Sequence, residues 1–396
     1  VNGELAVGVG PGHASLNIHN GATVEDSNGI LGESGASSAT ANVTTGATWR
    51  HSGNMVVGES GDGTLNVLSA GLVESVMGVV GVEGSSISSA TVNDATWTNA
   101  DNLYVGYGAT GTLDVQADGT VSNVDGVLGE LTTGNGAANI SGPGALWTNT
   151  GSLLVGHMGA GALNISNQGA VTVGSYLQIG ANGMVNLSGG TLTTPLILSN
   201  SGGAFNFTGG TLNVTASSVM IGVGGLLPSG QLIDPNKHLN VASRLTLLPG
   251  ATLTRQDGGT LTAGAFEALG GSTFTLAGGD LTLGSTFEVN GFYSNGRTGI
   301  APGSTLTLDD RNTAVFDSGA LVDLGPGASP AGLAAPNGIT FDFGSNVIGY
   351  GTIDTPDSIL TPVIANGAIL GASPAMPITL NGYVKGVGTL DNVVIA

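Results

Sequence analysis

Acidic side chains are the first candidates for catalysis, because glycoside hydrolysis needs two carboxyl groups a defined distance apart. The nearest candidates along the chain are Asp309 with Asp310, and Asp354 with Asp357. Successive residues of a strand point to opposite faces, so Asp309 and Asp310 would not face one sugar. Asp354 and Asp357 flank Pro356, which indicates a turn. Degradation of a polysaccharide is therefore the least favoured function, and we expect a protein that is not an enzyme.

The histidines and arginines show no spacing that builds a site. The five histidines are His13, His19, His51, His157 and His238. They form no His-Glu-x-x-His motif and no other metal-binding spacing. The glycine-rich runs precede strands rather than helices, so they do not indicate a phosphate loop or a nucleophile elbow. We assign no catalytic, cofactor-binding or metal-binding residue from the sequence.

Four glutamates recur close to glycines that themselves recur along the chain. They are Glu33, Glu59, Glu130 and, one residue displaced, Glu83. Stacked in a coil, they would form either an acidic stripe that holds structural Ca²⁺ or a solvated acidic edge. The nonapeptide repeat of calcium-binding β-rolls is absent. We expect the solvated edge and no cofactor, with structural Ca²⁺ as the alternative.

The composition is that of an acidic chain rich in small residues. Its 396 residues include 71 Gly and no Cys, and 9% of them are charged. The 27 acidic and 7 basic residues give a net charge of −20. Nucleic acids and anionic membranes attract clustered Lys and Arg, so neither is expected as a partner. No apolar run approaches the length of a membrane span, so we expect no membrane insertion.

A strand–corner–strand unit recurs through the first half of the chain. In Gly151–Ile165 a short apolar run leads through a glycine-rich corner to a second apolar run. Glycines that follow an aliphatic residue return every 23 to 27 residues, at Gly8, Gly32, Gly58, Gly81, Gly106, Gly129, Gly156 and Gly180. Tryptophans return after two such intervals, at Trp49, Trp97 and Trp147. A fixed period of this kind is the signature of a solenoid.

The apolar runs within each period are short and numerous, and helical patterns are nearly absent. They predict an all-β fold, a single-stranded parallel β-helix, right-handed, with about 16 or 17 rungs of roughly 20–27 residues. One polar column alternates with inward apolar residues, so it must point outward. Its members are Asn17, Asn42, Asn66, Asp114, Asn139, Asn164, Asn186 and Asn206. We expect a structural ladder of amide hydrogen bonds there, and a binding groove is the alternative.

Three regions differ in their repeat pattern. Residues 1–190 form the regular β-helix with Trp-marked double rungs. Residues 191–344 have shorter repeats, which predict shorter rungs. Within them, segments 226–238 and 290–302 carry proline, aromatic or basic residues and are expected to leave the coil as loops. Residues 345–396 are expected to form a terminal or assembly segment.

The repeats resemble those of a known class of exported proteins. Trp97–Gly106 and Trp147–Gly156 share the pattern Trp-Thr-Asn-x-Gly/Asp-x-Leu-x-Val-Gly, and Gly-Thr-Leu-Asn/Asp-Val runs follow similar strands. Together they resemble the passenger repeats of bacterial autotransporters and of large exported β-strand-repeat surface proteins. The resemblance implies a parallel β-helix that is secreted to the bacterial cell surface.

These observations favour an extracellular structural protein. We expect a rigid rod that assembles head to tail with copies of itself through its terminal rungs, giving a cell-surface or biofilm-matrix filament. Repeats begin at Val1 without a polar cap, and an open strand edge tends to pair with another chain. The alternative is a monomeric surface adhesin whose loops, 226–238 and 290–302, bind glycans or a host or matrix surface.

Overall fold

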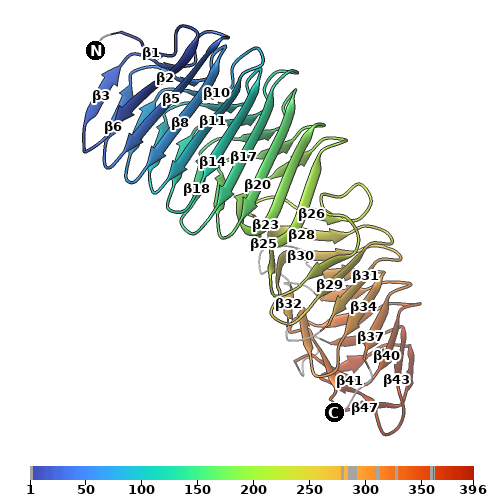
Figure 1. Ribbon diagram of the computed structural model, residues 1–396. Helices are drawn as coiled ribbons and strands as arrows, with labels where there is room; N and C mark the ends of the chain where they lie inside the picture. Colours follow the sequence, from blue (N-terminus) through green and yellow to red (C-terminus); the bar gives the residue numbers. More distant parts are fainter. Residues whose placement is uncertain are drawn as a thin grey trace. The chain divides into compact units, whose positions relative to one another are not determined.

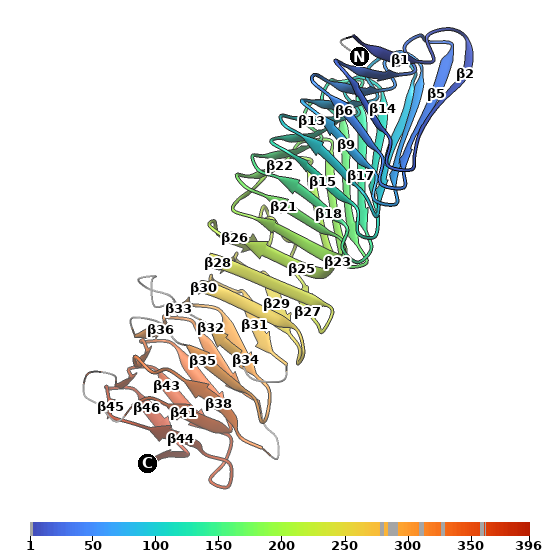
Figure 2. The same cartoon turned by 90° about the vertical axis from the view of Figure 1, so that its left-hand side faces the viewer.

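The computed structural model shows a coil of short parallel strands (Figures 1 and 2). It describes residues 3–277, 281–283, 292–308, 313–325, 329–356, 360 and 362–396. In these residues the paired strands are parallel, and no helix is present. The predicted all-β parallel solenoid, with roughly 24 residues per turn, is confirmed.

The chain divides into two compact units, Val1–Leu212 and Asn213–Ala396. In the first unit, each regular turn contains a short strand, a glycine corner, a longer strand and a third strand. One turn consists of β7 (Met55–Val57), β8 (Asp62–Leu68) and β9 (Leu72–Ser75). The boundaries that the sequence indicates near residues 190 and 344 stay predictions.

Register is kept from turn to turn in the first unit. The strand β7 pairs with β4 (Gly29–Leu31) below it and with β10 (Gly78–Val80) above it. Nine strands stack in this way in the first sheet, and successive turns are offset by 20 to 27 residues. The first seven offsets, 23 to 27 residues, equal the intervals between the recurring glycines, and the eighth is 20 residues.

The core lies along the axis of the coil. In β8, Leu65 and Val67 are fully buried, whereas Asn66 between them is partly exposed on the outer face. Leu65 stacks on Ala41 and Ala90 in the neighbouring turns, both fully buried. Burying a side chain such as Leu65 contributes about 1.5–3 kcal/mol, so the stacked apolar columns hold the turns together.

Glycine is required at the corner after the short strand. Seven of the eight recurring glycines have φ between +67° and +80°: Gly8, Gly32, Gly58, Gly81, Gly106, Gly129 and Gly156. This left-handed conformation disfavours residues with a Cβ atom. Space is also short, because a Cβ on Gly32 would lie 2.5 Å from the carbonyl oxygen of Asp62. The eighth, Gly180, has no such φ, but a Cβ there would lie 1.8 Å from the carbonyl oxygen of Gly156.

In the second unit, the two segments expected to be loops contain strands of the coil instead. Within 226–238, β27 (Gln231–Ile233) pairs with β29 (Thr252–Arg255), and Ile233 is fully buried. The expectation that 226–238 leaves the coil was therefore wrong for its central part.

Segment 290–302 was also expected to be a loop, and this was wrong as well. Asn290 and Gly291 lie outside the described residues. The residues that follow form β33 (Phe292–Ser294) and β34 (Arg297–Ile300). β33 pairs with β36 (Ala314–Phe316), and β34 pairs with β37 (Leu321–Leu324).

Candidate functional site

The three tryptophans form a column inside the first unit. Trp49, Trp97 and Trp147 are fully buried and lie in alternate turns. Val73 pairs with both Trp49 and Trp97, and Val121 pairs with both Trp97 and Trp147. Large and small residues therefore alternate along the stack, which explains why the sequence repeat spans two turns rather than one.

A glycine at the start of a neighbouring short strand makes room for the indole. A Cβ on Gly78 would lie 2.8 Å from Cζ2 of Trp97, and a Cβ on Gly126 would lie 2.8 Å from Cζ2 of Trp147. The residue that pairs with Gly78 in the next turn is Leu103, which is fully buried. The double repeat is thus a packing requirement of the core.

Each indole N–H donates to a buried polar residue of the preceding turn. Trp49 Nε1 donates to Asp26 Oδ2 at 2.7 Å, and Trp147 Nε1 donates to Asn123 Oδ1 at 2.7 Å. The equivalent contact from Trp97 Nε1 to the Ser75 hydroxyl is longer, at 3.4 Å. A buried indole N–H needs such an acceptor, so these polar residues belong to the structure of the column.

A second buried polar residue, two positions after each tryptophan, completes the row. His51 Nδ1 lies 2.5 Å from Asp26 Oδ1. The equivalent pairs are neutral: the Ser75 hydroxyl donates to Asn99 Oδ1 at 2.8 Å, and Asn123 Nδ2 donates to Asn149 Oδ1 at 2.7 Å. The sequence interpretation missed this row. Its signal is present, because alternation along a strand places residue i+2 on the same face as the tryptophan.

The Asp26–His51 pair is the ionisable version of this arrangement. Both side chains are completely shielded from solvent. Burial lowers the pKa of His51, and the neighbouring Asp26 opposes this effect without overcoming it. Nε2 of His51 is buried and has no hydrogen-bond partner among the described residues.

The polar column of the outer face forms the hydrogen-bond ladder that its spacing predicts. Each amide Nδ2 donates to the side-chain oxygen of the residue one turn earlier, at 2.7 to 2.9 Å. The pairs, donor first, are Asn42–Asn17, Asn66–Asn42, Asn139–Asp114, Asn164–Asn139, Asn186–Asn164 and Asn206–Asn186. Thr91 pairs with both Asn66 and Asp114 in the sheet and interrupts the amide row.

A similar ladder in the second unit was missed. Asn240 Nδ2 donates to Asn213 Oδ1 at 2.8 Å, and the Thr262 hydroxyl donates to Asn240 Oδ1 at 2.8 Å. These residues follow one another at 27 and 22 residues, compared with 20 to 25 for the bonded pairs of the first ladder. In the same unit the Tyr293 hydroxyl donates to Asp317 at 2.6 Å, and this bond raises the pKa of Tyr293 to about 12.

Three of the recurring glutamates, Glu33, Glu59 and Glu83, lie near one another at a corner of the first unit. The pKa of Glu59 is raised, mainly by burial and then by the negative charges of Glu33, Glu4 and Glu83. The Ser60 hydroxyl donates to Glu83 at 2.7 Å. Within the described residues, no group of three or more His, Cys, Asp or Glu side chains could hold a metal ion. The acidic corner therefore supplies no observation in favour of Ca²⁺.

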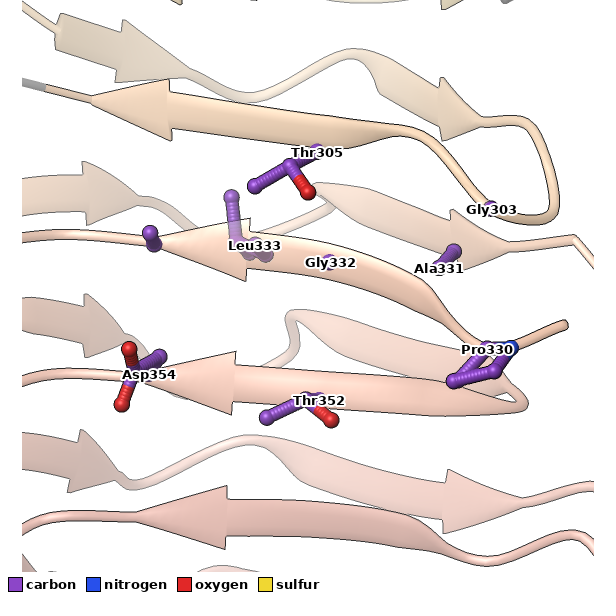
Figure 3. A pocket seen from close by; sticks show the side chains of 9 residues that line it. Gly303, Thr305, Pro330, Ala331, Gly332, Leu333, Thr352 and Asp354 are labelled. Atoms are coloured by element: carbon purple, nitrogen blue, oxygen red, sulfur yellow. The ribbon is translucent and has the colours of Figure 1, made fainter. Parts of the chain in front are cut away.

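A shallow hollow of about 290 Å³ lies on the outer face of the second unit (Figure 3). It crosses β35 (Thr305–Leu308), β38 (Ala331–Ala334) and β41 (Gly351–Asp354). Gly332 pairs with both Thr305 and Thr352, so the hollow is a gap in a threonine column.

One of the carboxylates considered from the sequence lines this hollow. Asp354 lies at the end of β41 and is exposed beside it. Asp309, Asp310 and Asp357 lie outside the described residues. Among the described residues the hollow is lined by one carboxylate, whereas glycoside hydrolysis uses two.

Comparison of the sequence with protein-family models gives no match, and comparison with curated proteins gives none either. The chain is thus identified by its structure alone, as a parallel β-solenoid repeat protein. In the part of the chain that the structure describes, no helix has the length and hydropathy needed to cross a membrane.

Proposed function

We propose that the chain is a structural solenoid of the bacterial cell surface or extracellular matrix, and that copies of it associate end to end. The observation that carries this proposal is the repetition of apolar columns in register from turn to turn, up to the last described turn. That turn consists of β45 (Val384–Lys385), β46 (Thr389–Asp391) and β47 (Val393–Ile395). The strands β46 and β47 are the terminal strands of their sheets.

Residues of the last turn continue core columns that are closed one turn below. Leu390 stacks on Ile369, and Ile395 stacks on Leu380. Ile369 and Leu380 are fully buried, whereas 41% of Leu390 and 60% of Ile395 are exposed. A further turn stacked on them would cover these side chains and extend the backbone ladder.

The first described turn also carries apolar residues of the core columns. Its strand β1 (Leu5–Val7) is the first in the order of the first sheet and pairs with β4. Val24 of this turn is partly exposed, although it stacks on the fully buried Trp49. A turn from another copy would cover apolar residues and complete the backbone ladder at either face, which is the mode of strand addition.

The outer surface supports a structural rather than a catalytic role. In its most regular feature, the amide ladder, the side chains hydrogen-bond to one another. The net charge of −20 keeps separate copies apart by repulsion, so association through the apolar ends should strengthen as salt screens that charge. The resemblance to autotransporter passenger repeats supports the surface location.

The test compares substitutions at neighbouring residues of β47. Ile395→Asp places a charge on the open core face and is expected to weaken self-association strongly. Val394→Asp adds the same charge on the opposite face, since Val394 stacks on the outward Thr379. Sedimentation velocity over a dilution series measures both variants. A chain that stays monomeric at all concentrations and salt levels, or equal effects of the two substitutions, would contradict the proposal.

A further inference from the structure

The buried Asp26–His51 pair has neutral equivalents elsewhere in the same coil. The same position in the next two double turns is filled by Ser75 with Asn99, and by Asn123 with Asn149. All three pairs are almost completely buried beneath a tryptophan. The structure of the coil therefore needs a hydrogen-bonded pair at this position, but it does not need an ionisable one.

Among the described residues, Asp26 is the charged group that acts on His51. Asp26 faces it from β3 (Thr23–Asp26), and the ring also contacts Trp49 of its own strand, with ring centroids 4.7 Å apart. Gly29 approaches it from β4, since a Cβ there would lie 2.4 Å from its ring. Ser75, the next inward residue of β9, is uncharged.

The charged residues of the same strands point to the other face. Arg50 forms exposed ion pairs with Glu25 and Glu74 across the outer surface. These three side chains are separated from His51 by the strands themselves, because alternate residues of a strand point to opposite sides.

Acid has a specific consequence for this geometry. In neutral His51, Nδ1–H donates to Asp26, and Asp26 accepts a second bond from the indole of Trp49. A proton added at Nε2 creates a buried N–H donor for which the described residues offer no acceptor. A buried donor without a partner is costly, so the cluster takes up this proton favourably only when it opens.

We propose that the Asp26–His51–Trp49 cluster is an acid-sensitive latch that holds the first two turns of the solenoid closed at neutral pH and lets them open in mild acid. This proposal does not depend on end-to-end association. Burial holds the pKa of His51 below its ordinary value, so the open state binds the proton more tightly than the closed state. The stabilisation is present above about pH 6.5 and is lost as the pH falls toward the lower pKa of the closed state.

Hydrogen–deuterium exchange followed by mass spectrometry between pH 7 and pH 5 tests the latch, after correction for the intrinsic pH dependence of exchange. Opening of residues 23–57 is expected to increase by up to about tenfold per pH unit below pH 6.5. Residues 72–105 and 120–155, which hold the neutral pairs, are expected to show no such increase. Equal pH dependence in all three segments would overturn the proposal.

Two variants separate the latch from a merely structural role. Asp26→Asn with His51→Asn copies the third double turn and is expected to remove the pH dependence of residues 23–57, whatever its effect at pH 7. Ser75→Asp with Asn99→His installs the pair in the second double turn and is expected to confer acid-sensitive opening there. A remaining pH slope in the first variant, or none at the new site in the second, would overturn the proposal. The second variant gives this answer even if the first fails to fold.

Discussion

Replacement of the buried tryptophans by phenylalanine separates packing from hydrogen bonding in the core. Trp97→Phe and Trp147→Phe remove the same atoms from fully buried positions, each beside a glycine that leaves room for the indole. The two sites differ in the bond that is lost. Trp147 Nε1 donates to Asn123 Oδ1 at 2.7 Å, whereas Trp97 Nε1 contacts Ser75 at 3.4 Å.

The difference between the two variants can be estimated from these bonds. Trp147→Phe leaves the buried carbonyl oxygen of Asn123 without its donor, which costs about 1–3 kcal/mol. Trp97→Phe leaves the Ser75 hydroxyl with a hydrogen-bond partner, because it still donates to Asn99 at 2.8 Å. The common packing loss cancels, so Trp147→Phe should open its turns about 5- to 150-fold more than Trp97→Phe opens its own.

Exchange of backbone amides in the turns around each tryptophan measures this difference, because it reports local opening within a repeat protein. The wild-type opening of each segment is the reference for its own variant. Equal increases at the two sites, or a larger increase for Trp97→Phe, would refute the assignment of the short bond as the stronger contact.

Two further predictions concern the corners and the outer ladder. Gly156→Ala and Gly46→Ala both introduce a Cβ at φ near +70°, which costs about 1–2 kcal/mol. Only at Gly156 would the Cβ also clash, 2.5 Å from the backbone nitrogen of Gly183. The denaturation midpoint of Gly156→Ala should therefore fall further than that of Gly46→Ala, and equal midpoints would contradict this explanation. Asn164→Ala breaks two ladder bonds and should reduce local stability by about 1–3 kcal/mol, against about 0.5–1.5 kcal/mol for the one bond broken by Asn206→Ala. Local amide exchange measures both losses. If the ladder contributes nothing to stability, neither variant will change the exchange.

The regular features of the fold could be predicted because they follow from backbone geometry. Alternation along a strand places Asn66 outside and Leu65 inside, and a fixed offset between turns aligns Asn66 with Asn42. The corner glycines could be predicted for the same reason, since a tight corner such as that at Gly58 requires a positive φ.

The interior polar row could not be derived from an apolar-in, polar-out rule. Asn99 and Asn149 point inward, where their Oδ1 atoms accept from Ser75 and Asn123, the residues that also bond the indole N–H groups. In the sequence, their position two residues after a tryptophan is the signal for them. This position predicts an inward side chain only once the tryptophan itself is known to be buried.

The prediction of loops at 226–238 and 290–302 was wrong for a related reason. Proline was taken to exclude residues 226–238 from the coil, because proline cannot donate to a central ladder. The structure places Pro228 and Pro235 on either side of the short strand β27 rather than within it. Strands of three residues leave corners that are long enough to hold prolines without any departure from the coil.

Electron microscopy of the purified chain over a dilution series tests the central claim most directly, that copies associate end to end through their terminal turns. We expect unbranched filaments that shorten on dilution, and that are lost in Ile395→Asp but kept in Val394→Asp. Dispersed single particles at every concentration, or assemblies that persist unchanged in Ile395→Asp, would contradict the account.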